Sequence, residues 1–185
     1  MFRRRRPLGP RRAPVDRAQL LLNQAHRLFE SGQYLQAARL FEQLAQGATR
    51  RQLPRAPFLF LQAGKAYLFG GQEDQGMALI RAGLKTLAVE KRWPELERVG
   101  RRTVAELAEQ GFTGPSEEIK GWLDETLSGI ETPRPRQIAA GKAGKAALPT
   151  KCPSCGGSVD PQAVTWLDDV TAECLYCGSA IRAEN

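Results

Sequence analysis

The chain has 185 residues, 42% of them hydrophobic, and a formal net charge of +7. Its length predicts one ordinary domain with a small second unit, and no apolar run approaches the roughly 20 residues that a membrane-spanning helix needs. The N-terminal segment lacks the apolar core of a secretory signal peptide, so we expect a cytoplasmic protein without a membrane span.

The excess positive charge lies outside the expected folded units. Residues 1–17 carry seven arginines and one acid, and residues 134–151 carry five bases and no acid. Residues 18–133 carry fourteen bases and fourteen acids, whereas residues 152–185 carry one base and five acids. Two interpretations of the basic segments stay open: they contact nucleic-acid phosphates, or they are ordinary solvated chain.

Residues 1–15 combine arginine with proline and have no apolar periodicity. This composition cannot bury enough surface to fold, which predicts a disordered basic arm. Residues 131–150 are rich in proline, glycine, alanine and lysine, which predicts a flexible linker. The arm and the linker leave two units to fold, residues 16–130 and residues 151–185.

Residues 16–130 show helical apolar periodicity throughout. Breaks fall near Gly32, Gly47, Gly71 and Gly111, and prolines suit the first turns of the later helices. We therefore predict a mainly α fold of about six helices that form three hairpins. The apolar stripes include Leu21, Ala25 and Leu28; Tyr34, Ala37 and Phe41; Phe60, Gly64 and Tyr67; Met77, Ile80 and Leu84; Leu96, Val99 and Leu107; and Ile119, Trp122 and Leu123.

The first two hairpins repeat one pattern. Leu21-x2-Gln24-Ala25-x2-Leu28…Ala37-x3-Phe41 overlays Phe60-x2-Ala63-Gly64-x2-Tyr67…Gly76-x3-Ile80. Both copies resemble the tetratricopeptide (TPR) repeat. The small residues of this pattern would allow paired helices to approach closely.

The TPR resemblance implies an α-solenoid whose concave groove binds a protein or a peptide. Asn23, Gln24 and Lys65 are the candidate groove residues. The two units are 39 residues apart, whereas the family repeat has about 34. A helical-hairpin array without TPR ancestry therefore remains the alternative.

All four cysteines of the chain fall in two C-x2-C pairs, Cys152 with Cys155 and Cys174 with Cys177. Eighteen residues separate the inner two. This spacing is typical of a four-thiolate metal site, and Gly156 and Gly178 follow each pair where a tight turn needs positive φ. A disulfide or redox C-x-x-C is the alternative.

The two pairs and their glycines resemble the zinc-ribbon family over residues 151–182. The resemblance implies one structural Zn²⁺ held by Cys152, Cys155, Cys174 and Cys177, and a small β unit. The sequence predicts its strands at residues 163–167 and 170–173, with Asp168-Asp169 as the turn. Iron accepts the same four sulfurs, so the choice between zinc and iron stays open.

No catalytic constellation is visible, and we expect a non-enzymatic protein. His26, the single histidine, has no serine or cysteine partner in sequence and is interpreted as a helix-face or groove residue. Arg98, Arg101 and Arg102 lie among acids, which indicates a mixed-charge surface. The predicted function is a protein–protein interaction adaptor with a structural zinc module. The alternative is a nucleic-acid-associated protein that uses residues 1–17 and 134–151.

Overall fold

The structure, a computed structural model, describes residues 17–130, 147–162, 164–174 and 176–183. The predicted basic arm, residues 1–15, lies outside the described residues, as does most of the predicted linker, residues 131–150. The unit boundaries therefore stay predictions.

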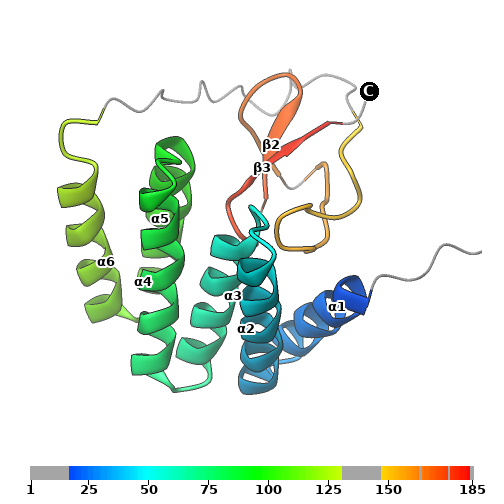
Figure 1. Ribbon diagram of the computed structural model, residues 1–185, viewed down its shortest axis with the longest axis horizontal. Helices are drawn as coiled ribbons and strands as arrows, with labels where there is room; N and C mark the ends of the chain where they lie inside the picture. Colours follow the sequence, from blue (N-terminus) through cyan, green and yellow to red (C-terminus); the bar gives the residue numbers. More distant parts are fainter. Residues whose placement is uncertain (1–16, 131–146, 163, 175, 184–185) are drawn as a thin grey trace, which may run out of the picture.

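Among the residues that the structure describes, six helices form an array in chain order (Figure 1), and the prediction of a mainly α fold of helical hairpins is confirmed. Each helix packs against the next, within hairpins and between them. Among the described residues, no helix combines the length and the apolar character that a membrane crossing requires. The helices are α1 (Arg17–Glu30), α2 (Tyr34–Arg50), α3 (Ala56–Phe69), α4 (Glu73–Val89), α5 (Trp93–Glu109) and α6 (Thr113–Thr126).

Helix α2 continues past Gly47, where the sequence predicted its end. Ala48 in its last turn is buried in the core, and this packing outweighs the helix-weakening effect of one glycine. The chain instead turns at Gln52, which has a left-handed φ of 52°. Lys91 occupies the corresponding position after α4 with a φ of 55°.

The predicted close approach of paired helices is found between α3 and α4. A Cβ atom on Gly64 would lie 2.7 Å from the carbonyl oxygen of Gly76 and 2.6 Å from Cγ1 of Ile80. A Cβ on Gly76 would lie 2.8 Å from the carbonyl oxygen of Gly64. The two glycines therefore allow the helix backbones to contact each other directly.

Helix α3 lies at the centre of the molecule and is buried almost all round. It packs against α2 on one side and α4 on the other. Its two buried polar side chains, Gln62 and Lys65, point to the C-terminal unit, which they contact. The most apolar helix therefore packs within the helical array and also contacts the C-terminal unit.

The C-terminal unit contains the predicted small antiparallel sheet, in the order β1 (Thr165–Trp166), β2 (Thr171–Glu173) and β3 (Ala180–Arg182). Trp166 pairs with Ala172, and Ala172 pairs with Ile181. The predicted turn at Asp168 is confirmed, because its carboxylate accepts the backbone N–H of Val170 at 2.8 Å. Strand β3 was not predicted, because Ile181 is its only residue with a high strand propensity.

Candidate metal centre

Both C-x2-C pairs form turns with the same backbone hydrogen bonds. The amide of Cys152 donates to the carbonyl of Gly157 at 2.8 Å, and that of Cys174 donates to Ser179 at 2.9 Å. In return, Gly156 donates to Cys152, and Gly178 donates to Cys174. We call these two turns the knuckles.

The glycine positions of the knuckles confirm the prediction of positive φ. Gly156 has a φ of 73° and Gly178 has a φ of 69°. These values lie in the left-handed region that glycine adopts without strain. Each knuckle thereby holds its two cysteines on one side of a tight turn.

The knuckles bring all four sulfurs together. The Sγ atoms of Cys152, Cys155, Cys174 and Cys177 lie within 4.8 Å of one another, and all four residues are buried. The Cys152–Cys177 and Cys155–Cys174 sulfur pairs are 3.8 and 3.7 Å apart. Sulfurs around a tetrahedral ion, each about 2.3 Å from it, are separated by about 3.8 Å. The donor set therefore fits a metal ion.

Disulfide formation does not describe this cluster. All four cysteines are free, and their sulfur separations far exceed the roughly 2.05 Å of an S–S bond. Hydrogen bonding from neighbouring sulfurs, first of all Cys155, lowers the pKa of the Cys152 thiol. Burial raises the pKa of the Cys177 thiol. A cation at the centre would replace the protons that the buried thiols otherwise share.

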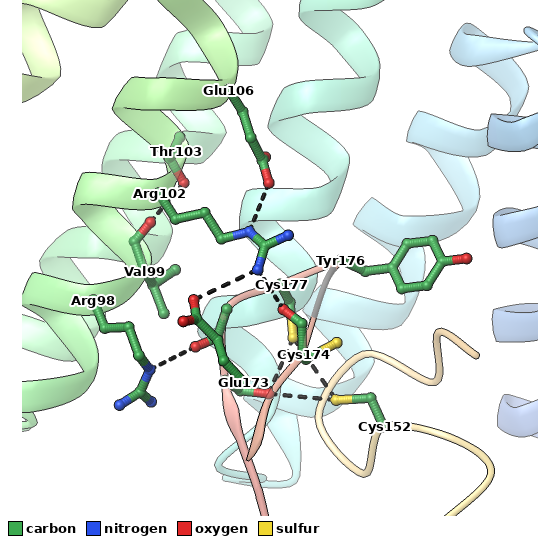
Figure 2. A network of polar contacts seen from close by, with 12 residues as sticks. Arg98, Val99, Arg102, Thr103, Glu106, Cys152, Glu173, Cys174, Tyr176 and Cys177 are labelled. Atoms are coloured by element: carbon green, nitrogen blue, oxygen red, sulfur yellow. Dashed lines mark hydrogen bonds and ion pairs between the residues drawn. The ribbon is translucent and has the colours of Figure 1, made fainter. Parts of the chain in front are cut away.

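The knuckles dock on the face formed by α1, α3 and α5, the first helices of the three hairpins, which we call the α1–α3–α5 face. Side chains from this face donate to backbone carbonyls of both knuckles. Arg98 Nε donates to Gly178 at 2.7 Å, and Arg102 Nη1 donates to Cys174 at 2.8 Å (Figure 2). These are charge-assisted hydrogen bonds to the turns that carry the ligands.

Helix α3 adds two donors to one carbonyl. Gln62 Nε2 and Lys65 Nζ both donate to the carbonyl oxygen of Tyr176, Lys65 at 2.9 Å. Lys65 also pairs with Glu106 at 2.7 Å, and Arg102 holds the other oxygen of Glu106 at 2.7 Å. The buried ammonium thus bridges Glu106 on α5 and the second knuckle.

Helix α1 contacts the first knuckle. His26 Nε2 lies 2.7 Å from the carbonyl oxygen of Cys155, and because a carbonyl only accepts, this nitrogen carries the proton. Burial lowers the pKa of His26, which favours the neutral ring. The ring packs edge-on against Phe41 and Tyr176. His26 is therefore a helix-face residue that positions a knuckle, which agrees with its predicted place on a helix face.

The two units also share a core. All four cysteines and Ile181 belong to the same buried cluster as Leu61, Leu96 and Val99. A Cβ on Gly156 would lie 2.6 Å from Cγ of Leu22 on α1. The C-terminal unit is therefore packed into the helical array.

The predicted groove residues have mixed outcomes. Lys65 and Asn23 lie on the α1–α3–α5 face and contact the C-terminal unit of the chain itself: Lys65 donates to Tyr176, and Asn23 accepts a hydrogen bond from Lys151 at 2.7 Å. Gln24 is exposed. The interpretation of Arg98 and Arg102 as mixed-charge surface was wrong, because both bind knuckle carbonyls. Arg101 does pair with Glu97 at the surface.

Sequence reasoning missed several residues of this interface: Gln62, Glu106, Glu173 and Tyr176. Gln62 and Lys65 were visible as the polar interruptions of the apolar run from Phe58 to Phe69. The others gave no local signal, because their partners lie far away in sequence. Arg102 and Glu173, for example, are 3.5 Å apart.

The chain has no significant match among protein-family models, curated proteins or solved structures. The described structure is a helical array with a buried cluster of four cysteines that can hold a metal ion.

Proposed function

We propose that this chain is a non-catalytic interaction protein in which one structural Zn²⁺ fixes a zinc ribbon against a TPR-like helical array. The observation that carries the proposal is the buried set of four sulfurs that all lie within 4.8 Å of one another, with two pairs at the separation expected around a tetrahedral ion. Four thiolates complete the coordination of zinc and leave no position for substrate or water. A site of this kind stabilises structure.

The surroundings of the site support a structural role. The roughly thirty residues of the ribbon are too few for an independent core, and they gain one from the ion and from the α1–α3–α5 face. The single histidine donates to a backbone carbonyl and is buried. Reduced thiols at the centre suit a reducing compartment such as the cytoplasm.

The proposed partner is a protein or a peptide. Arrays of helical hairpins bind partners through the surface that their stacked helices share. In this chain the ribbon occupies part of the α1–α3–α5 face, so a partner would meet helices and ribbon together. The interaction surface then depends on the metal, because the ribbon supplies one of its walls.

Affinity capture with the full chain tests this proposal. The metal-loaded chain is used as bait with a chemical cross-linker, beside a Cys174→Ser/Cys177→Ser variant. We expect a protein that the wild type retains, that cross-links to the helices or ribbon, and that the variant loses. Equal recovery with both baits would contradict the proposal, as would capture of nucleic acid alone.

A further inference from the structure

A cavity of about 210 Å³ remains open where the second knuckle meets the α1–α3–α5 face. Phe29 from α1, Phe69 from α3 and Tyr176 from the knuckle supply its aromatic walls. Sites for drug-sized ligands have about 300–1,000 Å³. The size of this cavity therefore suits one side chain of a partner.

The aromatic walls are held in place by their neighbours. The Phe29 and Phe69 rings have centroids 5.7 Å apart, and Phe69 stacks on Phe112 at 5.8 Å. Tyr176 contacts His26 edge-on and donates from its hydroxyl to Glu30 at 3.1 Å. Faces of such rings attract cations.

The charges around the cavity are negative in sum. Lys65 lines the cavity, but Glu106 neutralises it at 2.7 Å. Arg102, which holds the other Glu106 oxygen, is balanced in turn by Glu173 at 3.5 Å. Two further carboxylates, Glu109 in the lining and Glu30 beside Tyr176, are exposed. Within the described part of the chain, neither forms a salt bridge.

We propose that this cavity receives a basic side chain of a partner peptide, with arginine preferred over lysine. The planar guanidinium stacks on aromatic faces and pairs with carboxylates, and it is more weakly hydrated than an ammonium. Glu109 and Glu30 supply the opposite charge. This inference rests on the proposed function and names the chemistry by which the partner is recognised.

The test is a solution NMR titration of the full metal-loaded chain. The probe is a short peptide that contains one arginine, beside the same peptide with lysine or with citrulline, a neutral analogue of arginine. The side-chain amides of Gln62 and Gln110, which line the cavity, report binding. We expect saturable shifts with arginine, weaker ones with lysine, and about tenfold weaker binding with citrulline.

Two variants connect the binding to the cavity. Glu109→Gln removes an exposed carboxylate that forms no ion pair among the described residues. We expect this substitution to weaken the binding of the arginine peptide several-fold. Glu117→Gln, an exposed acid on α6, is the matched control and should leave binding unchanged.

Equal binding of arginine and citrulline peptides would overturn the inference, and so would the absence of shifts at these amides. The proposed function is judged separately. A partner that is captured by the wild type, and captured equally by Glu109→Gln, would leave the interaction role intact while removing this cavity as its recognition site.

Discussion

Lys65 donates a hydrogen bond of 2.9 Å to the carbonyl oxygen of Tyr176 and so joins the centre of the most apolar helix to the second knuckle. The two residues are 111 positions apart in the chain. The ammonium is buried, and its charge is balanced by Glu106. This contact helps to hold the second cysteine pair, which flanks Tyr176, in place against the helical array.

Replacing Lys65 by methionine tests that coupling. The variant keeps the apolar stem but leaves the Tyr176 carbonyl with Gln62 alone and Glu106 with Arg102 alone. We expect a loss of about 2–4 kcal/mol in the free energy of unfolding, measured by urea denaturation. Lys85→Met, at an exposed position of α4, is the control and should change stability by less than about 0.5 kcal/mol. An equal loss of stability in Lys65→Met and Lys85→Met would contradict the proposed role of Lys65 in joining the helices to the second knuckle.

The pKa of Glu106 predicts a pH-dependent contribution to the stability of the protein. Burial alone would raise this pKa, but Lys65 and Arg102 together lower it below its ordinary value of 4.5. The lowered pKa contributes stability above about pH 4.5, and this contribution is lost as the pH falls through the folded-state pKa. We expect the free energy of unfolding of the wild type to exceed that of Glu106→Gln by a constant amount at neutral pH. Below about pH 4.5 this difference should become smaller.

Urea unfolding of both proteins across this range measures the margin. Protonation of the cysteines affects both proteins, so it largely cancels in the difference. A margin that does not change with pH would show that Glu106 is not held as a carboxylate by its two partners.

Gly64→Ala tests the contact between α3 and α4. The added methyl would lie 2.7 Å from the Gly76 carbonyl oxygen, and a backbone atom cannot move aside as a side chain can. We expect destabilisation by about 1–3 kcal/mol in thermal or urea unfolding. Gly121→Ala in α6 is the matched control, since nothing lies within 4 Å of the new atom. It should stabilise the helix by up to about 1 kcal/mol.

Lys91→Gly should stabilise the protein. Lys91 holds a left-handed φ of 55° at the end of α4, where Arg92 N–H donates to the Leu87 carbonyl in a glycine-favouring helix end. The free energy gained by removing this backbone strain exceeds the entropic cost of ordering glycine, which is more flexible in the unfolded chain. We expect the free energy of unfolding to rise by about 0.5–1 kcal/mol. Lys91→Ala removes the same charge but keeps the Cβ, and an equal gain there would refute the backbone explanation.

The sequence predicted what depends on local pattern. Helical periodicity located most of the helices, because each of these buries one stripe, such as Leu84 and Leu87 on α4, against its neighbours. Helix α3 is buried almost all round, and Pro54 and Gly70-Gly71 marked its ends. The cysteine spacing and the glycines after each pair located the cluster, because a knuckle is set by a few adjacent residues. The Gly64–Gly76 contact followed from two small residues at repeat-related positions.

The rest depends on contacts between distant segments. The charge on Arg98 and Arg102 resembles that of a solvated helix face, and only the docked knuckles show that these residues bind backbone carbonyls. Gln52 and Lys91 end helices where glycine would be expected, so their sequence gave no turn signal. Docking of the C-terminal unit was not predictable because backbone carbonyls are acceptors in every sequence.

The central claim is that one metal ion, bound by four sulfurs, holds the C-terminal unit in place. Elemental analysis of the chain, purified under reducing conditions, tests it most directly, with Cys155→Ser/Cys177→Ser as the control. We predict one zinc per wild-type chain and no stoichiometric metal in the variant. Fresh wild-type protein without bound metal, or with its cysteines joined as disulfides, would contradict the claim.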